Sequence, residues 1–140
     1  MPASYTLHPS HNLVHVRYVG TVTTDESAES FMSYIMSGQA RPGHLIFIDF
    51  SECVELRMDF SDMVTLVAEK LGLLDPYEAT MVTSIWAQDQ AIYDMCMEYQ
   101  RLTSGSEKQM VAVFHDRHKA LSFLQISPEA MAEMGLESAQ

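Results

Sequence analysis

Two short segments at the start of the chain, residues 5–7 and 13–19, are rich in apolar and β-branched residues that partly alternate with polar ones. A turn-rich stretch, residues 8–12, separates them, so this arrangement predicts a β-hairpin. Three later segments predict further strands, at residues 44–50, 80–86 and 109–114. The first of these is an almost unbroken apolar run, which is typical of a central strand covered on both faces. Residues 51–58 are mixed and predict a loop, with residues 54–56 as a candidate short extended piece.

Apolar residues at helical spacing predict helices between these strands. The three clearest stripes are Ala28, Phe31, Met32, Ile35 and Met36; Met63, Leu66, Val67 and Leu71; and Ile92, Met95, Cys96, Tyr99 and Leu102. Residue types that cap helix N-termini precede each predicted helix, at Thr23, Asp59, Asp89, Asp116 and Ser127. Thr23 and Glu26 also have the spacing of a capping box.

The predicted order of elements is β-β-α-β-α-β-α-β-α with a terminal helix. Strands that alternate with helices indicate an α/β fold with a mixed, mostly parallel sheet, in which the N-terminal β-hairpin supplies an antiparallel edge and the helices pack on the sheet. A chain of 140 residues predicts one domain. We assign it to residues 1–126, followed by a short C-terminal helix and a frayed tail in residues 127–140.

The composition excludes several classes of protein. With 47% hydrophobic residues the chain is too apolar for a disordered protein, and it lacks the run of about 18 apolar residues that a membrane span needs. The net charge is −11 and the basic residues are scattered, so we expect no binding to nucleic acid. Contact with anionic membranes is expected to be peripheral at most. The first residues lack a basic start and an apolar run, which predicts a cytoplasmic protein.

No catalytic or metal-binding motif stands out. The sequence has no nucleophile elbow, phosphate-binding glycine loop or dinucleotide fingerprint, so we expect neither an enzyme nor a cofactor. The histidines near the hairpin, His8, His11 and His15, lack the spacing of a metal site. The two cysteines are expected to be free thiols, with Cys96 in the core and Cys53 in the predicted loop.

The region that follows the strand at residues 44–50 offers the candidate site, because open α/β sheets bind ligands beyond the carboxyl ends of their strands. The candidate residues for a switch or binding loop are Asp49, Ser51, Asp59, Ser61 and Asp62. Asp59 has the role of a helix cap, and capping alone explains these residue types. A phosphate on Ser61 would be favoured by the helix dipole but opposed by the two neighbouring aspartates.

The chain is also unusually rich in methionine, with 11 residues. Six of them lie on or near predicted apolar helix faces: Met32, Met36, Met63, Met95, Met131 and Met134. Methionine is flexible and fills irregular gaps in a core. The same property suits an adaptable apolar pocket or a groove for a partner, and the sequence leaves both interpretations open.

In its element order and in two motifs the chain resembles the STAS superfamily, and within it the SpoIIAA-like bacterial proteins. The first motif is Ile48-Asp49-Phe50-Ser51 followed by Asp59-Phe60-Ser61-Asp62-Met63, similar to the Asp-Leu-Ser strand end and Asp-Ser-Ser-Gly-Leu helix start of STAS domains. The second is Val113-Phe114-His115-Asp116-Arg117 with Ala120-Leu121 and Phe123-Leu124. It is similar to the Val-Phe-x-Asp-x-x-x-Ala-Leu-x-Trp-Leu ending of the SpoIIAA-like group. The resemblance covers residues 5–126.

The resemblance implies a non-enzymatic binding or regulatory module for a partner protein or a small apolar ligand. It also implies an alternative, because anti-sigma-factor antagonists of this superfamily are phosphorylated on the second serine of Asp-Ser-Ser-Gly, where Ser61 stands here. In this chain Phe60 replaces the first serine and Asp62 replaces the glycine. We therefore hypothesise that Ser61 is not a regulatory phosphosite and that the protein works by constitutive binding.

Overall fold

Five strands form one mixed sheet whose spatial order, β1-β2-β3-β4-β5, repeats their order along the chain. The computed structural model describes residues 3–40, 43–76 and 80–135. β1 and β2 form the predicted antiparallel hairpin, and the other neighbouring pairs are parallel. The α/β fold class is therefore confirmed. The strands are β1 (Ala3–His8), β2 (Leu13–Thr23), β3 (Leu45–Arg57), β4 (Met81–Trp86) and β5 (Gln109–Phe114).

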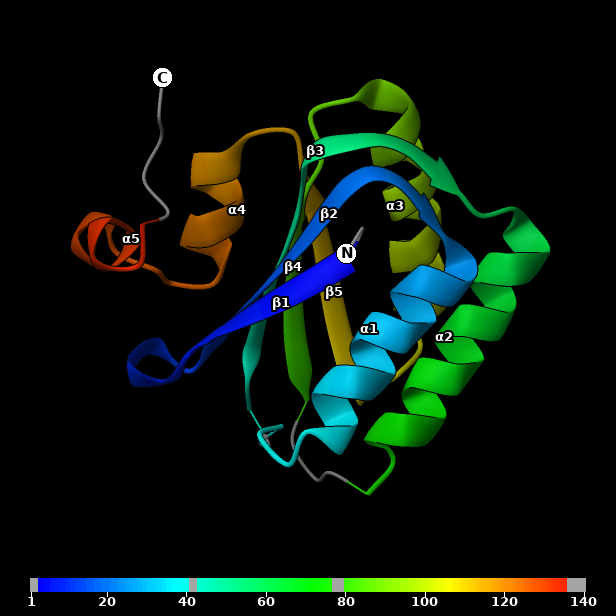
Figure 1. Cartoon of the computed structure of the whole chain (residues 1–140), viewed down its shortest axis with the longest axis horizontal. Coiled ribbons are helices and arrows are strands. Elements are labelled where there is room, and N and C mark those ends of the chain that lie inside the picture. Colours follow the sequence, from blue (N-terminus) through cyan, green and yellow to red (C-terminus); the bar gives the residue numbers. More distant parts are fainter. Residues whose placement is uncertain (1–2, 41–42, 77–79, 136–140) are drawn as a thin grey trace.

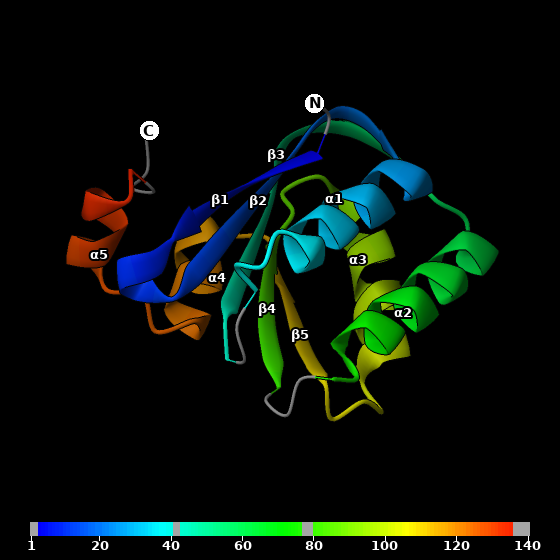
Figure 2. The same ribbon diagram turned by 60° about the horizontal axis from the view of Figure 1, so that its bottom comes forward.

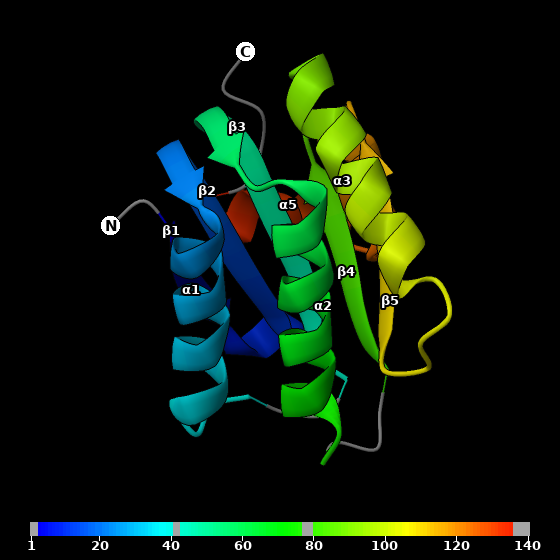
Figure 3. The same ribbon diagram turned by 90° about the vertical axis from the view of Figure 1, so that its right-hand side faces the viewer.

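The helices form two layers, one on each face of the sheet (Figure 1). Three long helices cover one face, where they lie side by side in front of the strands (Figure 3). Two short helices cover part of the other face, and a 3-10 turn, η1, lies in the hairpin. The helices are α1 (Thr24–Met36), α2 (Phe60–Leu74), α3 (Gln90–Thr103), α4 (Arg117–Phe123) and α5 (Pro128–Glu133), and η1 is Pro9–His11.

The five predicted helix caps are confirmed. Each cap side chain accepts a hydrogen bond from a backbone N–H in the first turn of its helix: Thr23, Asp59, Asp89, Asp116 and Ser127. Thr23 and Glu26 form the predicted capping box. A second box, formed by Asp59 and Asp62, opens α2. These bonds satisfy donors that a helix leaves free at its start, which explains why the helices begin where the sequence placed them.

The prediction of a loop at residues 51–58 is wrong, because β3 continues to Arg57 while paired with β2. The cause is two register shifts, at which β3 contains one residue more than β2. Val54 falls in the second shift and its side chain is 80% exposed, whereas Cys53 and Leu56 on either side are buried. The bulges break the period-two alternation that identifies a strand. Figure 2 shows β2 and β3 arching past β4 and β5 toward the helices. Cys53 is thus a buried strand residue, not a loop residue.

The sheet separates two apolar clusters. Along β2 and β3, Val14, Ile46 and Ile48 point to the large core under α1, α2 and α3. The alternate residues Leu13 and Phe47 point to a smaller core under α4 and α5. The last residues are predicted to fray, and residues 136–140 lie outside the described residues. The division of the chain after residue 126 stays a prediction.

Candidate ligand-binding site

The sequence-predicted site residues fall into two groups that the fold keeps apart. Asp49 and Ser51 lie on β3, and the strand continues through Arg57 before Asp59 opens α2. Ser51 donates hydrogen bonds from its backbone nitrogen (2.9 Å) and its hydroxyl (2.6 Å) to one carboxylate oxygen of Asp49. The other Asp49 oxygen lies 3.1 Å from Nε2 of His15 on β2.

These contacts determine the charge of Asp49. Burial raises the pKa of its carboxyl group, but the hydrogen bonds from His15 and Ser51 outweigh burial and the pKa is lowered from its ordinary value. The charged carboxylate orients the His15 ring, which stacks on Phe47 at a centroid distance of 5.2 Å. Asp49 therefore anchors β3 to β2 at the point where the first bulge begins.

The second group, at the start of α2, forms a closed set of local contacts. The backbone N–H of Asp62 donates to Asp59 at 2.7 Å, and the backbone N–H of Asp59 donates to Asp62 at 3.2 Å. Ser61 lies between them with an exposed side chain. The arrangement is explained by capping, and both carboxylates lie next to Ser61 in the first turn.

A residue that the sequence analysis did not single out, Lys70, occupies the centre of the large core. It projects from α2 and is only 6% exposed. Its Nζ donates a hydrogen bond to the hydroxyl of Tyr99 on α3 at 3.1 Å, and lies 4.9 Å from the centroid of that ring. The ring of Phe31 on α1 lies 5.3 Å away on another side. The ammonium group thus lies where three helices meet above the sheet.

The pKa of the Lys70 ammonium group is set by its aromatic surroundings and not by a carboxylate of the described residues. Burial by itself lowers the pKa of the ammonium group, but the phenol groups of Tyr99 and Tyr18 outweigh burial, so the pKa is raised from its ordinary value. Among the residues that the structure describes, no carboxylate forms an ion pair with it. Lysine is almost never fully buried without a partner, because an ammonium group loses its hydration there.

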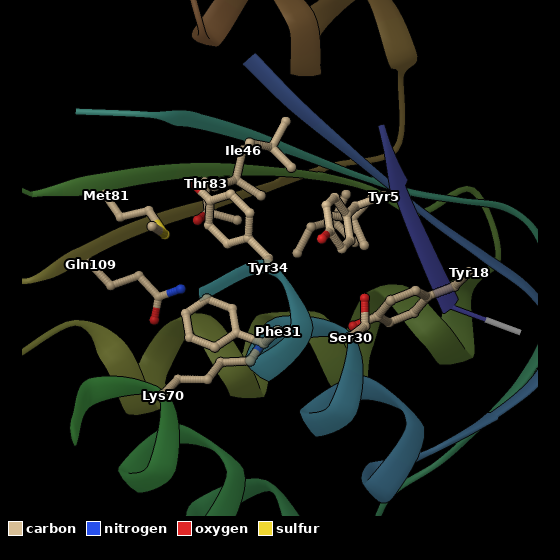
Figure 4. A pocket seen from close by; sticks show the side chains of 13 residues that line it. Tyr5, Tyr18, Ser30, Phe31, Tyr34, Ile46, Lys70, Met81, Thr83 and Gln109 are labelled. Atoms are coloured by element: carbon tan, nitrogen blue, oxygen red, sulfur yellow. The ribbon is translucent and has the colours of Figure 1, made fainter. Parts of the chain in front are cut away.

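Two small internal voids of about 30 Å³ each adjoin Lys70. Each has room for about two water molecules, since one needs roughly 10–15 Å³. The first lies between the sheet and α1, and the side chains of Thr83, Gln109 and Tyr34 converge on it (Figure 4). The hydroxyl oxygen of Thr83 is buried and has no hydrogen-bond partner in the described part of the chain. The second void is lined by Met63, Met95 and Cys96, among others.

An apolar groove on the surface between α1 and α2 leads to the same lysine. Its volume is about 270 Å³. Phe31 and Lys70 line both the groove and the first void, so these two side chains separate them. Met32 on the rim is 44% exposed, which is unusual for a large apolar side chain. The groove is lined by Ala28, Phe31, Met32, Leu66, Glu69, Lys70, Gly72 and Leu73.

A signal for Lys70 was present in the sequence. It lies seven residues after Met63, four after Leu66 and three after Val67, and therefore on the buried stripe of the helix. A lysine at such a position is an informative exception. Three of the methionines assigned to either core or pocket do line cavities around Lys70: Met32, Met63 and Met95.

A metal centre and a membrane-spanning helix are both absent from the described residues. Within them, no group of three or more histidine, cysteine, aspartate or glutamate side chains is arranged to hold a metal ion. In the same part of the chain, no helix has both the length and the apolar character required to cross a membrane.

Comparisons with known proteins bear on the fold. No protein-family model and no curated protein sequence matches the chain. A structure of an uncharacterised protein of the DUF3478 family from Shewanella loihica PV-4, with a SpoIIAA-like fold, is similar at a TM-score of 0.53 and 15% identity. The match covers 87% of this chain and 91% of that one. The anti-sigma factor antagonist SpoIIAA in its unphosphorylated form is 12% identical, with a TM-score of 0.47 and coverage of 88% and 97%. The chain has a SpoIIAA-like fold.

Proposed function

We propose that this protein is a non-enzymatic binding module that holds a small apolar acid, with the acidic group of the ligand against Lys70. The observation that carries the proposal is a buried ammonium group without an anionic partner among the described residues. A carboxylate or similar group would supply a negative charge beside Nζ. It would also accept hydrogen bonds from the Nζ donors that Tyr99 does not use. An ammonium group has three donors, and Tyr99 takes one of them.

The cavities fit an elongated ligand better than a compact one. A void of about 30 Å³ accommodates a small polar head beside Lys70 and the unpartnered Thr83 hydroxyl. The groove of about 270 Å³ between α1 and α2 is the place for an apolar tail. Entry requires Phe31 to rotate, because its ring lies between the two spaces. The flexible Met32 on the rim allows tails of different shape.

A phosphorylation switch at Ser61 is disfavoured by the local charges. The Asp59 carboxylate already accepts a hydrogen bond from the Asp62 N–H, and the Asp62 carboxylate accepts one from the Asp59 N–H, so neither N–H is available to a phosphate. Adding about −1.5 to −2 charges beside two carboxylates creates a repulsion that the helix dipole, worth about 0.3–1 kcal/mol, offsets only in part. Stoichiometric phosphate on Ser61 in the native host, with opposite partner capture by Ser61→Ala and Ser61→Glu, would restore that alternative.

Calorimetric titration with dodecanoate and with dodecanol tests the proposed ligand class. We expect saturable binding of the acid and binding at least tenfold weaker for the alcohol, which has the same tail without the charge. Lys70→Met should abolish this preference, because methionine keeps the apolar stem and removes the ammonium group. Lys119→Met is the matched control, since Lys119 is exposed on α4. Equal affinity for acid and alcohol, or a preference that survives Lys70→Met, would contradict the proposal.

The same variant separates function from folding. Lys70→Met should raise the free energy of unfolding by about 1 kcal/mol or more, because it removes a buried charge at similar volume. Tyr99 keeps a partner in the variant, since its hydroxyl also hydrogen-bonds Gln109. Urea unfolding measures this change. A variant that is more stable and no longer selects the acid would identify Lys70 as a binding residue rather than a structural one.

A further inference from the structure

A second pocket lies on the opposite face of the sheet from Lys70. Its volume is about 360 Å³, within the range of small-molecule sites. The two sites are on opposite faces because side chains alternate along a strand: Val14 and Val16 line the void near Lys70, whereas His15 and Arg17 line this pocket. It is lined by Thr6, His8, His15, Arg17, Phe47, Asp49, Glu52, Arg117, Met134 and Gly135.

The pocket contains two arginines, Arg17 and Arg117. The guanidinium group of Arg117 lies 5.9 Å from the ring centroid of Trp86, which holds it in place. One terminal nitrogen of Arg117, Nη2, is buried and has no hydrogen-bond partner among the described residues. No carboxylate of the described residues forms an ion pair with it. A buried guanidinium nitrogen without an acceptor destabilises the folded state, and a ligand oxygen that accepts its hydrogen bond would remove that cost.

The carboxylates of the pocket are engaged elsewhere. Asp49 accepts hydrogen bonds from His15 and from Ser51. Glu52 forms an ion pair with Arg17. At the outer end of the hairpin, His11 pairs with Glu133 of α5 at 3.1 Å. These acids thus pair with other donors, and none of them forms an ion pair with Arg117.

The two histidines of the pocket add donors but no fixed negative charge. His8 and His15 come from neighbouring strands of the hairpin, with Thr6 paired opposite His15. Burial lowers the pKa of His8, and the neighbouring His15 and His11 rings lower it further. Both His8 and His15 line the pocket, where their ring nitrogens can donate hydrogen bonds to an oxyanion.

From this geometry we infer that the pocket binds a small organic molecule through a phosphate or carboxylate group held by Arg117. The planar guanidinium fork matches both kinds of oxyanion. Phe47 and Met134 provide apolar walls for the organic part. The net charge of −11 does not prevent binding, because at physiological salt charges beyond about 8 Å are largely screened and the local donors decide. This inference is independent of the ligand proposed for Lys70.

Trp86 offers a direct readout, since it is the single tryptophan and contacts Arg117. The full chain is titrated with inorganic phosphate, glycerol 2-phosphate and succinate, against sodium chloride at matched ionic strength. We expect a saturable change in Trp86 fluorescence with at least one of the three oxyanions and none with chloride. Saturation by the phosphates alone identifies a phosphate ligand, and saturation by succinate alone identifies a carboxylate.

Variants locate the binding. Arg117→Gln should weaken it at least tenfold, and Arg117→Lys, which keeps the charge but not the fork, should weaken it by a smaller factor. The matched control Arg101→Gln removes an exposed arginine on α3 and should bind like the wild type, as should Lys70→Met. Thermal unfolding confirms that each variant is folded. The inference is overturned if no oxyanion gives a saturable signal, or if the signal is unchanged in both Arg117 variants.

Discussion

At the scale of single residues, two buried charged groups differ in how they are compensated. Asp49 has three hydrogen-bond contacts, from His15 and Ser51, and none of its charge is left without a partner. Within the described part of the chain, Lys70 has one hydrogen bond and two aromatic rings but no carboxylate partner. The first pattern is that of a structural hydrogen-bond network, and the second is that of the ligand-binding group proposed above.

The Asp49 contacts predict a pH dependence of stability. The folded-state pKa of Asp49 is lowered below its ordinary value of 3.8, so the folded state holds this proton less tightly than the unfolded chain. The stabilisation that the Asp49 carboxylate gives the folded state is therefore complete above about pH 3.8. It is lost as the pH falls through the lower pKa of the folded state. Asp49→Asn should be less stable than the wild type at pH 6. The difference in unfolding free energy should narrow as the pH falls below about 3.8, and it should vanish below the folded-state pKa of Asp49.

Urea unfolding between pH 2 and pH 6 measures that difference, with Glu29→Gln as a control on an exposed carboxylate. A difference between wild type and Asp49→Asn that is constant over this range would show that the carboxylate charge plays no part.

The start of α2 gives a second prediction at this scale. Asp59→Ala should cost about 1 kcal/mol of unfolding free energy, because it removes the cap and one half of the capping box. Ser61→Ala should cost clearly less, since the exposed Ser61 side chain is not a cap. Chemical denaturation of both variants decides the matter, and an equal or larger loss at Ser61 would reveal a structural role for the serine.

The caps could be predicted from sequence, whereas both pockets could not. A cap depends on residues three positions apart, so Thr23 and Asp59 are recognisable locally. Lys70 and Arg117 acquire their meaning from Tyr99 and Trp86, which lie far away in the chain. The lack of a counter-charge is visible only when every neighbour in space is known.

At the scale of elements, β3 shows where pattern reading fails. Its first half is an apolar run that any strand rule detects, but its second half contains two bulges. A bulge shifts the buried positions from every second to every third residue, as with Cys53 and Leu56. The sequence rule for strands assumes an uninterrupted ladder, and this strand departs from it.

The strand assignment of Cys53 predicts low thiol reactivity. The thiolate is the reacting species, and burial raises the pKa of Cys53, while burial raises that of Cys96 to about 12. In native protein neither thiol should react with an aromatic disulfide reagent within minutes, and both should react in denaturant. Val54→Cys places a thiol at an exposed position of the same strand and should react at once. Rapid reaction of native Cys53 would indicate that this segment is open.

At the scale of the whole molecule, one sheet supports two cores and two separate pockets. The larger core holds the space around Lys70, and the smaller core adjoins the pocket of Arg117. Because both cores share β2 and β3, neither layer of helices is independent of the other. We therefore expect the protein to unfold as one cooperative unit.

Leu121→Ala tests this coupling. Leu121 is fully buried in the smaller core, so its truncation should cost about 3 kcal/mol. The loss should be the same by Trp86 fluorescence, which senses the smaller core, and by far-ultraviolet circular dichroism, which senses all helices. Ser122→Ala, one residue further and exposed, should have little effect. Separate transitions for the two signals would mean that α4 and α5 unfold on their own.

The agreement between strand order and chain order has a consequence for synthesis on the ribosome. Each new strand adds to the outer edge of the sheet already made, so β1 to β4 and the first helices can assemble while later residues are still being added. Leu13 and Phe47, however, are covered only by α4 and α5, which come after all five strands. A growing chain therefore exposes a bare apolar face late in translation, and that face is where a chaperone would bind it.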